Sequence, residues 1–203
     1  MPLNMRWVIK LGGSLINAPE FRRWLHDCAV PAAVQSVVVT GGGGFANEVR
    51  KLQRTLEFGD ALAHELAIDA MSLNARVAQA LEPSLEPFSE AASLGGRSAL
   101  WFPSGSTVAG QVQVGWHVTA DSLAFALAQA VEACCVCLVK SCGADTFRAL
   151  DAGECAARGV IDAGLPDLMR ADPRPVRLLS KAEWGKFLQS RESGCLPGTP
   201  LRL

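Results

Sequence analysis

Two short apolar segments of the sequence each end in a run of glycines. Residues 5–11 read MRWVIKL and precede Gly12 and Gly13, and residues 34–40 read VQSVVVT and precede four glycines, 41–44. Apolar runs of this length, closed by glycine, are typical of buried strands that end in a tight turn. A helical pattern follows each turn, at residues 19–29 and again from residue 45. Alternation of strands and helices predicts an α/β protein with a mostly parallel sheet.

The rest of the chain continues this alternation. Residues 60–81 are rich in Ala and Leu and predict a long helix that Asp60 caps. Thr119 is the expected N-cap of a second clear helix, and Pro, Ser and Gly cluster at residues 83–96 without a predicted strand. The remaining expected elements are a strand at 98–102, a loop or hairpin at 103–115, a helix at 119–132, a strand at 133–140, a helix at 151–169, a strand at 176–179, a helix at 181–191 and a strand from residue 199. No repeat or linker divides the chain, so we expect a single doubly wound domain over residues 1–203.

Composition points to small-molecule chemistry. The 203 residues can bury one sizeable core, and a formal net charge of -1 offers no strongly basic face for nucleic acid or an anionic membrane. The apolar run at residues 131–139 is far shorter than the roughly 20 residues that a membrane span needs. The N-terminal residues show no signal-peptide pattern and the seven cysteines are an odd number, so we expect a cytoplasmic protein with free thiols.

Cys134 and Cys137 have a C-x-x-C spacing that resembles a metal site. Because side chains alternate along a strand, these two cysteines should point to opposite faces of the sheet. Zinc would need further ligands, and His117 and Cys142 are the only candidates. We therefore interpret Cys134, Cys135 and Cys137 as buried thiols and expect no metal site in the chain.

Three of the predicted strands end in residues that suit phosphate. Their carboxyl ends should meet at one edge of a parallel sheet, where ligands bind in such folds. Glycine turns let backbone N–H groups approach phosphate oxygens, and lysines add positive charge. The three segments are Lys10-Leu11-Gly12-Gly13-Ser14, Thr40-Gly41-Gly42-Gly43-Gly44 and Lys140-Ser141-Cys142-Gly143. Together they predict a site that handles phosphate groups.

The order of these motifs resembles the amino acid kinase family. The resemblance includes Thr-Ala-Asp-Ser-Leu-Ala at residues 119–124 and the ending Gly-Thr-Pro-Leu at 198–201, and the helix at 60–81 resembles that of the uridylate kinase branch. It implies a three-layer α/β/α sandwich and in-line transfer of the γ-phosphoryl group of ATP with Mg²⁺, without a covalent intermediate. Lys10 would hold the transferring phosphoryl group, Lys140 would contact the nucleotide phosphates, and Asp121 would orient both lysines. The implied phosphate-binding residues are Gly12, Gly13, Ser14, Gly42 and Gly43.

Among the branches of this family, the sequence is most similar to the short kinases of methanofuran-type cofactor synthesis. That similarity rests on the segments at residues 64–71, 116–122 and 159–162. It implies that the acceptor is a small phosphorylated molecule, aminomethylfuranylmethyl phosphate. The resemblance to short isoprenoid phosphate kinases, which use a helix histidine for the acceptor phosphate, implies that His64 binds the acceptor, and Asp60, four residues earlier at the start of the helix, is the second expected acceptor-binding residue. The family resemblance also suggests a homo-oligomer, such as a dimer through the helix at 60–81. Isopentenyl phosphate kinase and a uridylate-type kinase are the alternatives.

Two other functions remain open at this stage. Kinases of the family usually carry Asp-Val-Asp-Gly-Val-Tyr where residues 141–147 read SCGADTF, and a Gly-Gly-Met-x-x-Lys segment is missing, so a non-catalytic nucleotide-binding or anion-binding member is one alternative. Residues 41–46 also satisfy the dinucleotide fingerprint G-x-G-x-x-A, which suggests an oxidoreductase. That fingerprint requires an acidic residue at the end of the next strand, whereas Glu57, Asp60 and Glu65 fall at or inside the long helix.

Overall fold

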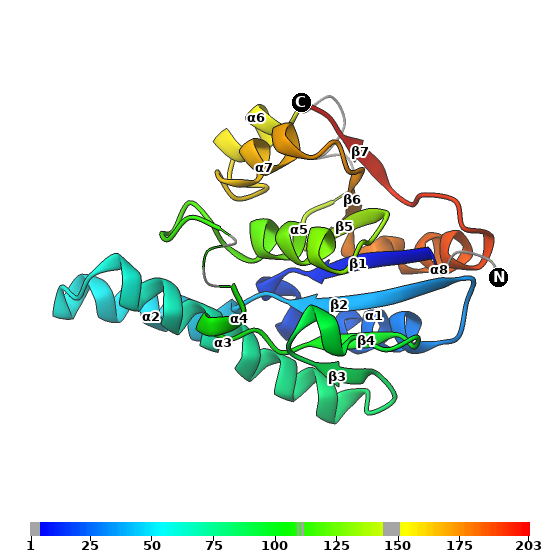
Figure 1. The fold of residues 1–203 in the computed structure, drawn as a ribbon, viewed down its shortest axis with the longest axis horizontal. Helices are drawn as coiled ribbons and strands as arrows, with labels where there is room; N and C mark the ends of the chain where they lie inside the picture. The colour runs from blue at the N-terminus through cyan, green and yellow to red at the C-terminus, as the bar shows by residue number, and fades with distance from the viewer. Residues whose placement is uncertain (1–4, 109, 111, 144–150) are drawn as a thin grey trace.

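The computed structural model describes residues 5–108, 110, 112–143 and 151–203. Its centre is a seven-stranded sheet with the strand order β3-β4-β2-β1-β5-β6-β7 (Figure 1). All neighbouring strands pair in parallel except β6 and β7, which are antiparallel. The strands are β1 (Met5–Leu11), β2 (Val34–Thr40), β3 (Glu86–Phe88), β4 (Ala99–Trp101), β5 (Cys135–Lys140), β6 (Val176–Ser180) and β7 (Thr199–Leu201). The α/β fold with a mostly parallel sheet is confirmed.

The strand that the sequence failed to predict is β3. It is three residues long, lies at the edge of the sheet, pairs with β4 alone and contains Pro87. Proline lacks a backbone donor and is tolerated in edge strands. Because the segment is rich in Ser and Pro, its sequence resembles a loop, and the strand was not predicted. The other strands lie within two residues of their predicted bounds.

Eight α-helices connect the strands within the described residues. They are α1 (Glu20–Ala29), α2 (Gly43–Leu56), α3 (Asp60–Leu81), α4 (Gly105–Val108), α5 (Ala120–Ala130), α6 (Ala152–Ala157), α7 (Leu165–Ala171) and α8 (Trp184–Ser193). The single helix predicted at 151–169 is wrong: α6 and α7 are separated by a turn in which Gly159 has a φ of 67°. The described part of residues 103–115 contains the short helix α4 and no hairpin. Asp60 is the first residue of α3 and does not cap it, because Gly59 occupies the N-cap position.

The sheet separates two hydrophobic cores. Residues of α5, α6 and α7 pack on one face, and residues of α1 and α8 pack on the other, which gives three layers (Figure 1). The alternation along β1 decides which side chain enters which core: Val8 faces the α5 side, whereas Trp7, Ile9 and Leu11 face the α1 side. Helix α3 contributes to both cores.

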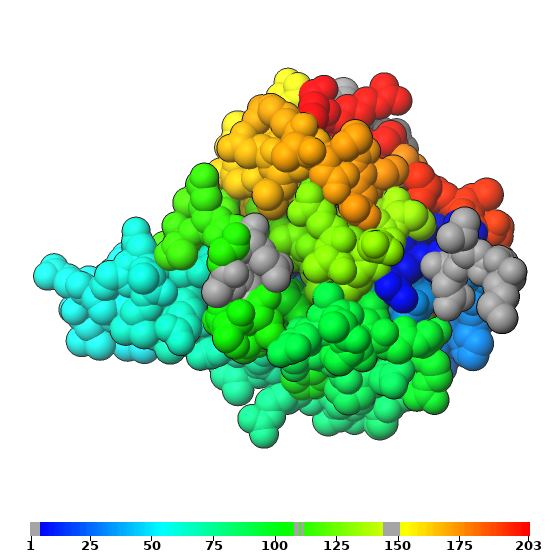
Figure 2. Space-filling model, in the orientation of Figure 1, coloured from blue at the N-terminus to red at the C-terminus, as the bar shows by residue number. Residues whose placement is uncertain are grey.

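Helix α2 projects from the rest of the molecule (Figure 2). None of its residues is buried, and Leu52 and Leu56 are 48% and 67% exposed. Three of the apolar positions that suggested a long helix in α3 are also exposed, namely Leu62, Leu73 and Val77. The exposed apolar side chains of α2 and α3 therefore do not contribute to either core.

The cysteine segment is only partly as expected. Cys135 and Cys137 are buried, with their sulfur atoms 4.0 Å apart, and burial raises the pKa of Cys137 well above its usual value. Cys134 precedes β5 and is exposed, so its prediction as a buried thiol is wrong. Among the described residues, no group of three or more His, Cys, Asp and Glu side chains is placed to hold a metal ion. In the same part of the chain, no helix combines the length and apolarity needed to cross a bilayer.

Arg191 of α8 forms hydrogen bonds with the end of α1 and the start of β2. It is completely buried, and its guanidinium donates to the carbonyl oxygens of Val34 at 2.8 Å, Val30 at 3.0 Å and Asp27. Burial lowers the pKa of Arg191, since the charged form loses its hydration. The carbonyls of Asp27 and Val30 lie where α1 ends, so the guanidinium satisfies acceptors that the helix leaves without partners.

We predict that Arg191→Met lowers the free energy of unfolding by about 3 kcal/mol, because several buried carbonyl groups lose their donors. Urea unfolding followed by circular dichroism measures the change. The control is Arg170→Met, which removes an exposed ion pair with Asp167 and should cost about 0.5 kcal/mol or less. Equal losses in the two variants would contradict this interpretation of Arg191.

Candidate active site

The two lysines predicted to contact phosphate lie on the same face of the sheet. Lys10 shares the face of Val8, and Lys140 shares the face of Leu138, because side chains alternate along each strand. Strands β1 and β5 are neighbours and parallel, so both lysines lie near the carboxyl ends of adjacent strands. This is the face that α5 covers, and α5 begins with Asp121 in its first turn.

Asp121 forms ion pairs with both lysines. Its Oδ1 lies 2.8 Å from Nζ of Lys10 and its Oδ2 lies 2.7 Å from Nζ of Lys140. The three side chains are only 4–12% exposed. Burial disfavours the carboxylate, but attraction to the two ammonium groups outweighs it and holds the pKa of Asp121 well below its usual range. For Lys140, burial is the larger effect and lowers its pKa in spite of the ion pair.

Asp162 fixes the start of α5, although it is 40 residues away in the sequence. Its Oδ2 accepts from the N–H of Thr119 at 2.8 Å and of Ser122 at 2.9 Å, and its Oδ1 accepts from the Ser122 hydroxyl at 2.5 Å. Thr119 is the N-cap as predicted, but its own side chain makes no capping bond and donates to Asp162 instead. The N–H of Asp162 donates to Oδ2 of Asp121 at 3.2 Å. Asp162 therefore positions both the helix and the carboxylate between the lysines.

The two glycine turns pack backbone against backbone. A Cβ atom on Gly13 would lie 2.4 Å from the nitrogen of Gly43, so only glycine fits there. Gly43 has a φ of 53° and begins α2, whose first N–H groups have no intrahelical partner. The amide of Asn74 on α3 donates to the carbonyl of Gly41 at 2.7 Å and holds the second turn in place. The N–H groups of the first turn of α2 that have no intrahelical partner can therefore donate hydrogen bonds to phosphate oxygens, beside the positive charges of Lys10 and Lys140.

Gly12 differs from the other predicted phosphate-binding residues. Its N–H donates to the carbonyl of Val139 at 3.0 Å, which extends the pairing of β1 with β5. The N–H of Gly12 is therefore engaged within the sheet in this structure, and its role as a phosphate donor stays a prediction. Ser14, by contrast, places its hydroxyl 2.9 Å from that of Ser141, so the turns after β1 and β5 meet through two exposed hydroxyl groups.

A cleft of about 460 Å³ opens beside Lys10. The cleft has both apolar and polar lining residues. The polar groups are amides, hydroxyls, the His64 imidazole, the Trp116 indole and the cations of Lys10 and Arg50, with no Asp or Glu among the described residues that line it. The lining residues are Lys10, Gly13, Ser14, Asn17, Gly42, Gly43, Gly44, Ala46, Asn47, Arg50, His64, Ala67, Ile68, Met71, Trp116, Val118, Thr119, Ala120 and Leu123. The composition of this wall favours an anionic ligand with an apolar part.

Of the two residues predicted to bind the acceptor, His64 lines the cleft and Asp60 does not. His64 lines the cleft, is 9% exposed, and its Nδ1 lies 3.4 Å from the N–H of Gly115. Burial lowers the pKa of His64, which outweighs the opposing effect of the Gly115 contact. Asp60 is exposed and does not line the cleft; its Oδ1 accepts from Nε2 of Gln53 at 2.7 Å.

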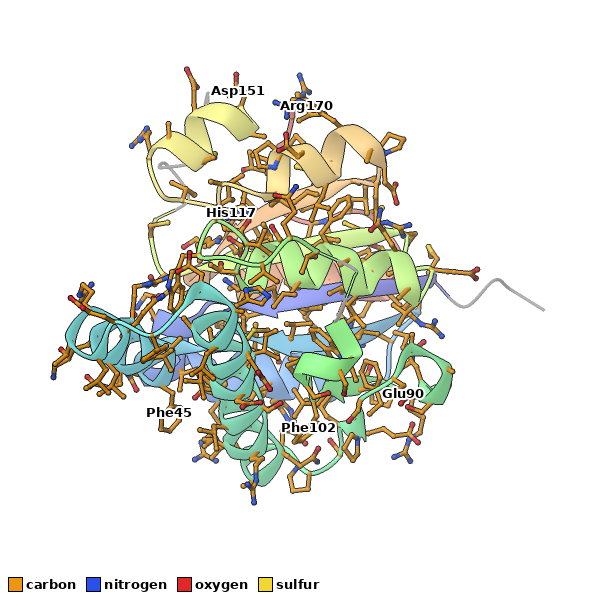
Figure 3. The ribbon with its side chains drawn as sticks, turned by 60° about the vertical axis from the view of Figure 1, so that its left-hand side comes forward. Phe45, Glu90, Phe102, His117, Asp151 and Arg170 are labelled. Atoms are coloured by element: carbon orange, nitrogen blue, oxygen red, sulfur yellow. The ribbon has the colours of Figure 1, made fainter. Side chains whose placement is uncertain are left out.

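Residues 112–118 lie beside α2 and the start of α5 (Figure 3). Nε1 of Trp116 donates to Oε1 of Gln53 at 2.6 Å, and the Arg50 guanidinium lies 4.1 Å from the centre of the Trp116 ring. Asp60 is therefore linked to the cleft-lining Trp116 through the side chain of Gln53. Figure 3 shows Phe45 on the side of α2 away from His117.

Sequence reasoning did not assign a role to several residues of this site, namely Asn47, Arg50, Asn74, Trp116 and Asp162. For Asn47 and Arg50 a signal existed, since they follow Gly43 and Gly44 at helical spacing and so share the face that meets the cleft. Asp162 lies in the segment 159–162 that resembles the family, but its role could not be read from that segment, because its partners Thr119 and Ser122 are distant in the sequence. Residues 144–147, where the family motif departs most, lie outside the described residues.

A buried carboxylate between two lysines, at the glycine-rich edge of a parallel sheet, defines a site for phosphoryl groups. Comparison with known proteins gives the family: residues 5–197 match the model of the amino acid kinase family, and the chain belongs to it. The family match supports a phosphotransferase and overturns the oxidoreductase alternative, because the glycine-rich turn then belongs to the phosphate site of this family.

Individual relatives refine this comparison. A curated protein, [5-(aminomethyl)furan-3-yl]methyl phosphate kinase of Methanocaldococcus jannaschii, is 39% identical over 67 residues. That stretch covers 32% of this chain and 31% of the relative, so the chain matches about a third of that protein.

Two solved structures show the same fold over nearly the whole chain. The uridylate kinase of Archaeoglobus fulgidus has a TM-score of 0.69 at 20% identity and covers 97% of this chain and 100% of its own. The UMP kinase of Bacillus anthracis has a TM-score of 0.66 at 14% identity, with 97% and 95% covered. The three-layer architecture is thereby confirmed.

The low pKa of Asp121 predicts how stability depends on pH. In the unfolded chain an aspartate titrates near 3.9, whereas folded Asp121 stays ionised to a lower pH. Its ion pairs therefore stabilise the folded state fully above about pH 5, and this contribution is lost as the pH falls below about 3.9 towards the folded value.

The measurement is urea unfolding of the wild type and of Asp121→Asn between pH 7 and pH 3. We expect the difference in free energy of unfolding to be constant from pH 7 to about pH 5 and to shrink at lower pH. A difference that stays constant to pH 3 would mean that Asp121 gains nothing from the two lysines.

Proposed function

We propose that this chain, acting as one kinase domain over residues 1–203, transfers the γ-phosphoryl group of ATP to a phosphomonoester, [5-(aminomethyl)furan-3-yl]methyl phosphate. The observation that carries the proposal is the cleft beside Lys10, which is cationic and has no carboxylate among its described lining residues. A phosphate oxygen is already anionic and attacks without a general base, whereas an alcohol acceptor would need one. The partial match to the Methanocaldococcus enzyme supports the choice of acceptor.

In this proposal an oxygen of the acceptor phosphate bonds to the γ-phosphorus as the bond from that phosphorus to the β–γ bridging oxygen breaks, and ADP leaves. Lys10 neutralises charge on the migrating group, and Lys140 does so on the nucleotide side. Asp121 holds the ammonium groups in place, and the N–H groups of Gly13, Gly42 and Gly43, with the Ser14 hydroxyl, face the phosphate oxygens. Mg²⁺ would accompany ATP and offset the charge of its phosphates.

One observation favours a second acceptor, isopentenyl phosphate. The apolar residues Ala67, Ile68, Met71 and Leu123 line the cleft, and the described lining residues offer no carboxylate to pair with the ammonium group of the furan acceptor. An isoprenoid phosphate has an apolar body and no cation, so it also fits this surface.

The test is a screen of acceptors with Mg-ATP, in which ADP release is measured for the furan phosphate, isopentenyl phosphate, UMP, aspartate and glutamate. We expect the furan phosphate to give the highest kcat/KM. Lys10→Ala should lower kcat at least about a hundredfold, the usual cost of removing one transition-state donor, with little change in KM. The matched control Lys51→Ala removes an exposed lysine of α2 and should be fully active. Activity with carboxylates alone would contradict the proposal, and an active Lys10→Ala would remove Lys10 from the mechanism.

We also propose that the chain forms a homo-oligomer through α2 and α3. The support is the set of exposed apolar side chains that contribute to neither core, namely Phe45, Leu52, Leu56, Leu62, Leu73 and Val77. Light scattering should give a dimer or larger for the wild type and a smaller species for Leu73→Glu combined with Val77→Glu. A monomeric wild type would contradict the proposal.

His64→Ala should raise KM for the acceptor at least about tenfold, equivalent to roughly 1.4 kcal/mol of binding, and leave KM for ATP within about threefold. The reason is that His64 lines the acceptor cleft and, when neutral with Nδ1 facing the Gly115 N–H, carries its own N–H on Nε2. Steady-state kinetics measure both constants. His26→Ala, an exposed histidine paired with Glu82 and outside the cleft, is the control and should change neither.

The lowered pKa of His64 sets the sign of the pH effect. A phosphate stabilises the protonated ring, so the acceptor should bind more tightly at pH 5.5 than at pH 8, and the excess is lost as the pH rises through the pKa of His64. The ratio of KM in His64→Ala to KM in the wild type cancels the titration of the acceptor itself. That ratio should be larger at pH 5.5, and a ratio that rises with pH would overturn this role for His64.

A further inference from the structure

Arg50 faces the cleft without an ionic partner among residues 5–108, 110, 112–143 and 151–203. It lines the cleft and is half-buried, and its contact in this part of the chain is the Trp116 ring, 4.1 Å from the guanidinium. Two acids of α2 and α3 have other partners: Glu48 lies 3.5 Å from Lys51, and Asp60 accepts from Gln53. A partly desolvated guanidinium is stabilised by an anion, so this side chain is placed to receive one.

We propose that Arg50, oriented by Trp116, binds the phosphate that the acceptor already carries and thereby selects phosphate esters over the corresponding alcohols. This inference rests on the proposed function for the class of acceptor. A guanidinium presents parallel N–H donors that match two phosphate oxygens, which a lysine ammonium cannot do. Lys10 and Arg50 then have different roles: Lys10 contacts the migrating phosphoryl group, and Arg50 binds the phosphate of the acceptor.

The position of Arg50 on α2 agrees with this role. Arg50 follows Gly43 by seven residues, which corresponds to about 10 Å along a helix axis. Helical side chains lean towards the N-terminus, so a long arginine side chain that lines the cleft extends back towards the glycine turn. The guanidinium and the glycine N–H groups are therefore expected to face the acceptor phosphate from two sides.

A chain of contacts fixes the orientation of this guanidinium. Asp60 accepts from Nε2 of Gln53, which leaves Oε1 of the same amide to accept from Nε1 of Trp116 at 2.6 Å. The indole is thus held in one orientation, and Arg50 lies over its face, where the cation–π attraction restrains it. Asp60 and Gln53 act as positioning residues.

The same short segment brings His64 to this corner of the cleft. Gly115 contacts His64 through its N–H, and the next residue, Trp116, contacts Arg50. Gly115 has a φ of 141°, and a Cβ atom there would lie 2.8 Å from the His117 ring, so glycine is required for this path. His64 and Arg50 therefore flank one dipeptide, and both can face the same phosphate.

The test compares binding of a phosphate ester with binding of its alcohol. Isothermal titration of the wild type with [5-(aminomethyl)furan-3-yl]methyl phosphate and with the parent alcohol gives the preference for phosphate, and isopentenyl phosphate with isopentenol repeats it on a second scaffold. Arg50→Gln should reduce this preference at least about tenfold on the scaffold that binds. In kinetics it should raise KM for the acceptor by a similar factor and leave KM for ATP within about threefold.

Two variants complete the design. Arg54→Gln removes the same charge from an exposed position of the same helix, outside the cleft, and should leave the preference unchanged. Arg50→Lys keeps the charge and loses the planar fork, so it should restore less than half of the lost preference on a logarithmic scale. A preference in Arg50→Gln within about threefold of the wild type overturns the assignment, as does an equal loss in Arg54→Gln. If the wild type does not phosphorylate the furan phosphate but Arg50→Gln still loses its preference for isopentenyl phosphate, the proposed acceptor fails and the assignment of Arg50 stands.

Discussion

The ion pairs of Asp121 with Lys10 and Lys140 are the interaction on which the rest of the site depends. Two ammonium groups within about 3 Å of one buried carboxylate would repel one another strongly if the carboxylate were absent. With it, the cluster of three groups keeps a net positive charge at the edge of the sheet. A charge held in place before the substrate arrives needs no reorganisation when phosphoryl transfer begins, and this is how such sites lower a barrier.

The architecture explains how this cluster forms. In the sheet, β2 lies on one side of β1 and β5 lies on the other. The carboxyl ends of these three parallel strands therefore surround one crevice. The period of two along β1 and β5 turns both lysines towards α5, and Asp162 anchors the first turn of that helix. The position of Asp121 is therefore set by the sheet on one side and by the α6–α7 segment on the other.

Sequence patterns predicted the parts of the site that are locally encoded. The lysines and the glycine turns belong to single strand–turn–helix units, and the bounds of β1, β2 and α3 follow from short-range periodicity. The features that the sequence did not predict are non-local. The N–H of Gly12 is taken by Val139 because of the pairing of β1 with β5, and Asp162 caps a helix 40 residues earlier in the chain. The contact of Trp116 with Arg50 depends on where the segment before α5 lies, which its sequence does not specify.

The most direct test of these ion pairs is the titration of the Asp121 carboxyl group, followed by NMR of aspartate labelled with ¹³C at Cγ and assigned by comparison with Asp121→Asn. The Asp121 signal should not move between pH 7 and pH 3, because the two lysines hold the pKa of Asp121 well below its usual range. A carboxyl group with the ordinary pKa of about 3.9 would be nearly nine-tenths protonated at pH 3, with a corresponding change in shift. An Asp121 signal that titrates in this way would mean that the carboxylate does not hold the two lysines in place.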